Sequence, residues 1–335
     1  MQRREAVRQR VETYVAPVVA GLLALVTLIG LIGPAIKSPS PHDIPVGLVG
    51  PAPAVEQISS AFSTNAPGVF TFTTYGNEAD AVAGIDSRSV DGALIIGQGG
   101  PRLIVAGAAG DAVTGVITGA FTSVFQKQGQ ALPVETIHPF AAGDPHGLIL
   151  FFVVLAIVVS TLIAQALVGL RRGAGFVTQA VLVVVYAVVA APVAMGLATW
   201  IAGDYGPGFW SATAFVALAS AAIGAVVAGM AALLGRPGVA LAALVAVLLD
   251  LVCSGGPIGS QLLPDAYRLL APAMPAGQLY SAMRGALYFG GAGVGEPELV
   301  LAAWLAGGVV LMALGRLAHR EHASPAAVPA HAANR

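Results

Sequence analysis

Two histidines and two aspartates are the residues best suited to chemistry, and they flank a polar segment in the first half of the chain. His42 and Asp43 stand near its beginning, and Asp144 and His146 stand at its end. Imidazole and carboxylate groups are zinc ligands, and both ends of a segment inserted between membrane spans return to one membrane surface. Polar residues beside a membrane need no metal, so we expect no metal site. The candidate ligands, if a site existed, would be His42 and His146.

Sequence motifs for other chemistry are missing. The chain contains no GxxxxGK[ST] phosphate-binding loop, no GxSxG and no HExxH. The run GQGG at 97–100 resembles part of a dinucleotide-binding loop, but Pro101 and a strand-like RLIVA follow where that motif needs a helix. We therefore predict a hairpin turn there, and expect neither an enzyme nor a bound cofactor.

Composition indicates a protein of the lipid bilayer. Of 335 residues, 56% are hydrophobic and 10% are charged, whereas soluble proteins have about 25% charged residues. The net charge of −1 and the lack of a dense Lys/Arg face exclude nucleic acid as a partner. A single cysteine, Cys253, excludes an internal disulfide framework.

Charge-free apolar runs predict a polytopic α-helical membrane protein with six transmembrane helices. Basic residues in the segment 1–13, Arg171, Arg172 and the tail 317–335 all fall on one side, which the positive-inside rule assigns to the cytoplasm. Both termini are therefore expected there. The predicted spans are 14–36, 147–170, 174–202, 209–234, 237–253 and 298–316.

The segment 37–146 predicts a small extracytoplasmic α/β domain inserted between the first two spans. Its apolar runs IPVGLV, VFTFTTY, ALII and RLIVA have the length and β-branched content of strands, and helical stretches separate the first three. Apolar positions from Val113 to Phe125 recur with helical spacing, which predicts the last helix, with Asp111 as its N-cap.

The apolar stretch after the fifth span cannot form one helix, because glycines and prolines interrupt it. Irregular backbone at membrane depth is tolerated where it is buried in protein or lines a cavity. We therefore predict a re-entrant, outer-leaflet gate element over 254–297, in which Arg284 anchors a helix at the headgroups or simply extends toward them. The residues assigned to this gate are Ser254, Gly255, Gly256, Pro257, Pro264, Pro272 and Arg284.

The predicted spans contain almost no ionisable side chains. Asp250, at the outer end of the fifth span, is the only one contiguous with a span. Ion-coupled transporters use such residues as relays, so uphill transport by this chain would need another source of energy. Ser220, Gly224 and Ala228 have the spacing at which helices approach closely, which predicts tight packing and hints at a dimer.

A family resemblance rests on SGGPIGSQLLPDAYRLLAPAMPAGQLYSAMRGALYFGG at 254–291. This stretch resembles the element before the last span of type-2 ABC exporter permeases, which commonly pair an SGG-P turn, an LP step, a second proline and an A-x-R helix. The order of a basic N-terminal segment, one span, a large external domain opening with PVGLVGP and five further spans is similar to the YhgE/Pip-like branch.

The resemblance implies a bacterial plasma-membrane permease subunit that moves lipid-like, drug-like or other amphiphilic molecules outward. It further implies a cytoplasmic ATP-binding subunit as partner, and a homodimer or a pair with a similar permease. By position, Arg171 and Arg172 would lie in the loop that contacts the ATPase, although this loop is shorter than in many members. The alternative is a non-transporting sensor or cell-envelope scaffold that acts through its external domain, and an ATPase partner would discriminate the two.

Overall fold

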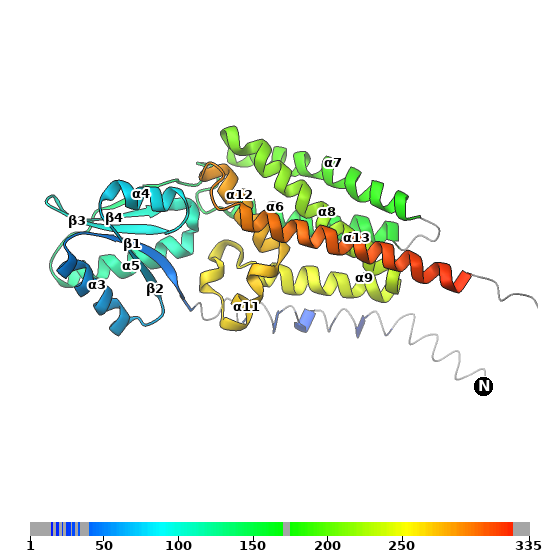
Figure 1. Ribbon diagram of the computed structural model, residues 1–335, viewed down its shortest axis with the longest axis horizontal. Helices are drawn as coiled ribbons and strands as arrows, with labels where there is room; N and C mark the ends of the chain where they lie inside the picture. The colour runs from blue at the N-terminus through cyan, green and yellow to red at the C-terminus, as the bar shows by residue number, and fades with distance from the viewer. Residues whose placement is uncertain are drawn as a thin grey trace, which may run out of the picture.

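The computed structural model describes residues 40–169 and 175–323, with single residues between 15 and 33. An α/β unit and a helical bundle follow one another along its long axis (Figure 1). The predicted span 14–36 is described only at scattered residues, so a sixth span stays a prediction, and Arg171 and Arg172 lie outside the described residues.

Five helices in the described residues are long and apolar enough to cross a membrane, which makes the chain a multi-pass membrane protein of mainly helical structure. These five helical stretches agree with the second to sixth predicted spans to within a few residues at most ends. Their bounds are Leu148–Val168, Phe176–Ala202, Gly206–Leu234, Arg236–Cys253 and Gly295–Ala318.

A five-stranded sheet with the order β2-β1-β3-β4-β5 forms the centre of the α/β unit. Its strands β1, β2 and β3 are parallel, β4 is antiparallel to β3, and β5 is parallel to β4. Gly97 pairs with Gly100 across the β3–β4 turn, which confirms the predicted hairpin. The short β5 was not predicted. The strands are β1 (Ile44–Val49), β2 (Phe70–Tyr75), β3 (Gly92–Gly97), β4 (Gly100–Ala106) and β5 (Val134–Ile137).

Helices cover both faces of this sheet (Figure 1). Helices α3 (Ala52–Asn65) and α5 (Asp111–Lys127) share an apolar core with one face, at whose centre Phe121 is fully buried. Helix α4 (Glu78–Asp86) packs on the other face. The N-cap predicted for α5 was wrong by one residue: Gly110 occupies that position, and its φ of 127° suits glycine.

Helix α8 (Phe209–Leu234) is the centre of the bundle and packs against α6 (Leu148–Gly169), α7 (Phe176–Ala202) and α13 (Gly295–Ala323). Glycines let α8 and α13 approach closely: a Cβ on Gly308 would lie 2.6 Å from backbone atoms of α8. A short turn, η3 (Gly206–Gly208), leads into α8.

The small residues predicted to pack tightly on α8 do so within the chain. The Ser220 and Thr161 hydroxyl groups are hydrogen bonded at 2.9 Å, and a Cβ on Gly224 would touch the side chains of Gln165 and Thr161. Because α6 and α7 already cover this stripe, it gives no support to a dimer.

The apolar helix Arg236–Cys253 and the segment that follows are irregular. The helix passes from α9 (Arg236–Ala243) through the π-helical η4 (Leu244–Asp250) to α10 (Leu251–Cys253), and its 18 residues rise about 27 Å, close to the hydrocarbon thickness. Only short elements follow before α13. They are η5 (Gly256–Ile258), η6 (Ser260–Leu262), α11 (Asp265–Leu270), η7 (Ala271–Ala273) and α12 (Pro275–Tyr288).

Candidate functional site

The broken segment, residues 254–274, begins where Asp250 meets the start of α12. Asp250 Oδ1 accepts a hydrogen bond of 2.7 Å from the backbone N–H of Ala276, while Met274, in the N-cap position, makes no side-chain cap. Asp250 therefore caps α12 from another helix. Its side chain is 1% exposed, and its Oδ2 is shielded from solvent and has no hydrogen-bond partner.

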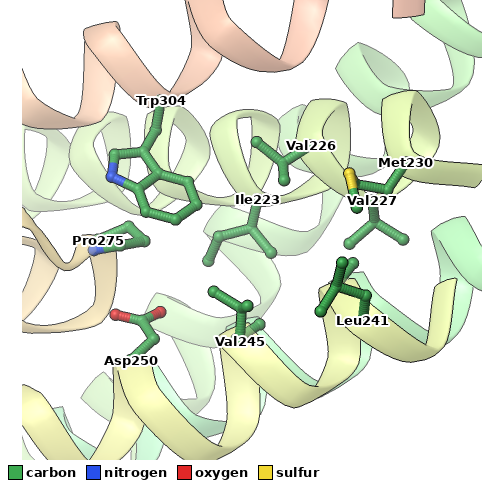
Figure 2. Close-up of a pocket in the computed structure, with 11 residues that line it drawn as sticks. Ile223, Val226, Val227, Met230, Leu241, Val245, Asp250, Pro275 and Trp304 are labelled. Atoms are coloured by element: carbon green, nitrogen blue, oxygen red, sulfur yellow. The ribbon is translucent and has the colours of Figure 1, made fainter. Parts of the chain in front are cut away.

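An apolar cavity of about 210 Å³ opens beside this carboxylate, between α8, α9 with η4, and α13. Figure 2 shows Asp250 and Pro275 at one end and Met230 and Leu241 at the other. Trp304 of α13 forms part of the wall, and its indole N–H donates to the carbonyl of Ala273 at 2.8 Å. The cavity thus combines an apolar wall with one acidic group at its end.

A second cavity, of about 300 Å³, lies between the broken segment, α12 and the α/β unit. Its lining is mainly polar and includes Arg88, Arg268, Arg284 and Glu296. Four of the predicted gate residues line it: Ser254, Gly256, Pro272 and Arg284. The structure therefore brings these four together around one space, which the sequence had not predicted.

The partition between the two cavities is narrow. The Ser254 N–H donates to the Asp250 carbonyl at 2.9 Å, and a Cβ on Gly277 would lie 3.1 Å from the Ser254 Cα. Asp250 faces the apolar cavity, whereas Ser254 and Gly277 line the polar one. One turn of chain at the start of the broken segment therefore separates them.

Glycine is required at the first turn of the broken segment. Gly255 and Gly256 have φ values of 71° and 46°, which side chains rarely adopt. A Cβ on Gly255 would lie 2.6 Å from the Gly259 carbonyl carbon, and one on Gly256 would lie 3.0 Å from the Phe151 ring. The predicted turn at Gly255 and Gly256 is thus a close contact with α6 as well as a helix break.

Arg88 and Arg284 join the α/β unit to α12. Arg88 donates from Nη2 to the Ser281 hydroxyl at 3.0 Å and from Nη1 to the Ser281 carbonyl at 3.1 Å. In the opposite direction, Arg284 donates to the carbonyls of Ala108 and Ala109. The Arg284 side chain thus meets the turn between β4 and α5, a contact that the sequence had not indicated.

Asp91, at the start of β3, is the acidic group that interacts electrostatically with both arginines. Burial raises its pKa to about 6, although Arg284 and Arg88 both favour the charged carboxylate. Burial lowers the pKa of Arg88 to about 10, and repulsion by Arg284 adds to this. Asp91 Oδ2 has no hydrogen-bond partner. Positive charge is therefore concentrated at this junction.

The two residues at the start of the α/β unit that could have served as zinc ligands, His42 and Asp43, contact the broken segment. His42 Nε2 lies 3.7 Å from a carboxylate oxygen of Asp265, and Asp43 accepts a hydrogen bond of 2.8 Å from Arg268. Asp265 also accepts from Arg268. These contacts dock α11 against the polar segment at 40–43.

The other two residues considered as ligands, Asp144 and His146, have their own partners. Asp144 Oδ2 accepts from the Ile149 N–H at 2.9 Å at the start of α6, and His146 Nδ1 lies 3.1 Å from Asp111 Oδ2. Across residues 40–169 and 175–323, no three His, Cys, Asp or Glu side chains are grouped as a metal site would require. His42 and His146 thus contact different carboxylates, Asp265 and Asp111.

Comparison with known proteins gives no relative: no protein-family model, curated protein or solved structure matches this chain. Sequence reasoning missed Arg88, Asp91 and Ser281, which are distant from the broken segment or lie in an ordinary helix. The only signal in the sequence was the position of Arg88, a basic residue between a helical stretch and a strand. In the structure Arg88 has a φ of 61°, which is uncommon for residues other than glycine.

Proposed function

We propose that this protein is the membrane permease subunit of an ABC-type exporter, and that it moves amphiphilic molecules outward with energy from a separate ATPase. The observation that carries this proposal is the pair of cavities on either side of the broken segment, one apolar among the spans and one polar under the α/β unit. An amphiphile has one part suited to each environment.

The apolar cavity suits part of a substrate. Its volume of about 210 Å³ is below the range of about 300–1,000 Å³ for complete small-molecule sites. A chain or ring of an amphiphile would bury apolar surface there, with a stabilisation of about 25 cal/mol per Å². Asp250 Oδ2, which lacks a partner, would accept a hydrogen bond from a polar group on the substrate.

The broken segment is suited to gating. Its short elements do not form a continuous helix, and side-chain contacts hold its end: Trp304 donates to Ala273, and Asp250 caps the following helix α12 at Ala276. Breaking the Asp250–Ala276 hydrogen bond and displacing Gly277 from Ser254 would connect the two cavities. This movement is the step that we assign to transport.

The source of energy lies outside the chain in this proposal. The sequence contains no phosphate-binding loop, so ATP hydrolysis requires a partner subunit on the side of the loop at 170–174, where Arg171 and Arg172 stand. In the same proposal the protein lies in a bacterial plasma membrane with both termini in the cytoplasm, the α/β unit lies outside, and a second permease completes the complex.

Affinity purification of the full chain in mild detergent, followed by mass spectrometry and an ATPase assay, tests the proposal. We expect a stoichiometric P-loop ATPase and ATP hydrolysis by the complex. Recovery of envelope proteins without any ATPase would contradict the permease and favour a scaffold. A variant with Arg171 and Arg172 both changed to Ala should lose the ATPase while keeping its fold.

A further inference from the structure

The polar cavity contains more positive than negative charge. Three arginines and one glutamate line it, and of the arginines only Arg268 is paired with carboxylates, those of Asp43 and Asp265. Among the residues that the structure describes, Arg88 and Arg284 have no carboxylate within ion-pair distance. The buried Asp91 interacts electrostatically with both arginines, so two guanidinium groups at this junction share one carboxylate and neither forms a direct ion pair.

The bonds that Arg88 and Arg284 make do not remove this imbalance. Their acceptors are the Ser281 hydroxyl and backbone carbonyls, which are neutral. Arg284 Nε is shielded from solvent and has no partner. Transferring a charged group out of water is unfavourable unless it is paired, so an anion in the adjoining space would stabilise both side chains.

We propose that the polar cavity binds a phosphate-type anion, supplied either as free phosphate or as the headgroup of an anionic lipid. Phosphate carries one to two negative charges. Arg88 and Arg284 share the single carboxylate of Asp91, so one positive charge remains for such an anion. Arginine also binds pairs of phosphate oxygens with two parallel hydrogen bonds. The Ser281 hydroxyl accepts from Arg88 and retains its own proton for donation to a ligand.

The size and place of the cavity agree with such a ligand. At about 300 Å³ it reaches the lower end of the range for small-molecule sites, so a headgroup fits and a whole lipid does not. It lies where the apolar helix Arg236–Cys253 has ended and α13 begins at Gly295. The site does not depend on the proposed transport, because a structural or regulatory anion would use the same residues.

A pair of glutamates on the first turn of α13 provides a test that leaves the arginine contacts intact. Glu296 lines the cavity, whereas Glu298 does not, and both are exposed. Glu296→Gln removes the only acidic lining residue and should increase anion affinity roughly threefold to tenfold. Glu298→Gln is the matched control and should leave the affinity unchanged.

The measurement is calorimetric titration of the purified full chain in detergent with inorganic phosphate and, separately, with short-chain phosphatidic acid or phosphatidylcholine. Phosphate binding indicates a soluble source, and binding of phosphatidic acid alone indicates a lipid source; either result supports the site if Glu296→Gln tightens it. Equal affinities for the two glutamine variants, equal binding of phosphatidylcholine, or no binding of either anion would overturn the inference.

Discussion

Asp250 allows the contact that we assign to the gate to be separated from the charge in the apolar cavity. Asp250→Ala removes the acceptor for the Ala276 N–H, which lies in a buried position at the start of α12. Asp250→Asn keeps an oxygen at the position of Oδ1 and replaces Oδ2 with an NH2 group. The two substitutions therefore differ in the cap and share the loss of the carboxylate.

The size of the effect follows from that single hydrogen bond. A lost N-cap costs about 0.5–2 kcal/mol, and an unsatisfied buried N–H costs about 1–3 kcal/mol, so we expect Asp250→Ala to lower the free energy of unfolding by about 2 kcal/mol. The deleted atoms also enlarge the adjoining cavity. Asp250→Asn should cost less, because its carbonyl oxygen continues to accept from Ala276.

Denaturant titration of the purified protein in detergent micelles, followed by tryptophan fluorescence, compares these variants, since Trp304 lines the same cavity as Asp250. The expected order of stability is wild type or Asp250→Asn first and Asp250→Ala last. If Asp250→Ala were as stable as the wild type, or Asp250→Asn as unstable as Asp250→Ala, the capping argument would be refuted.

Three further predictions concern packing, ionisation and a buried hydrogen bond. Gly308→Val should destabilise the bundle by about 3 kcal/mol, because a Cβ there meets the α8 backbone at 2.6 Å, whereas Gly307→Val meets nothing within 4 Å and should fold normally on thermal unfolding. Because the pKa of Asp91 is raised to about 6, its contribution to stability is greatest below about pH 4 and is lost as the pH rises through 6. The melting temperature of Asp91→Asn relative to that of the wild type should therefore increase between about pH 4 and pH 7. A double-mutant cycle of Thr161→Val and Ser220→Ala should give a coupling of about 0.6 kcal/mol, and a value near zero would mean that their hydroxyl groups do not interact.

Much of the local structure could be predicted from the sequence because single segments determine it. Charge-free runs of sufficient length identified the helices, and β-branched runs identified four strands of the sheet. The β5 strand (Val134–Ile137) was missed because it has only four residues and an exposed surface. Its place in the sheet depends on pairing with β4, and no pattern within the β5 residues themselves predicts that pairing.

The broken segment was predicted as irregular backbone because glycine and proline act locally. Its partners were not predictable, because Arg284 reaches Ala108 across 176 positions and Arg88 reaches Ser281 across 193. Apolar surroundings favoured headgroups as the place for Arg284, whereas buried carbonyls of the α/β unit were available as acceptors. Charge imbalance in the polar cavity likewise follows from tertiary packing.

Transport of an amphiphile is the central claim, and ATP-dependent uptake of a fluorescent cationic or anionic amphiphile into inside-out membrane vesicles tests it most directly. Uptake into the lumen corresponds to export from the cell. We predict uptake that requires both ATP and this chain, and that Ala246→Phe, which fills the apolar cavity, abolishes it while Ala302→Phe, on an exposed face of α13, does not. Uptake that is equal in vesicles with and without the chain would contradict the account, as would full activity of a stably folded Ala246→Phe.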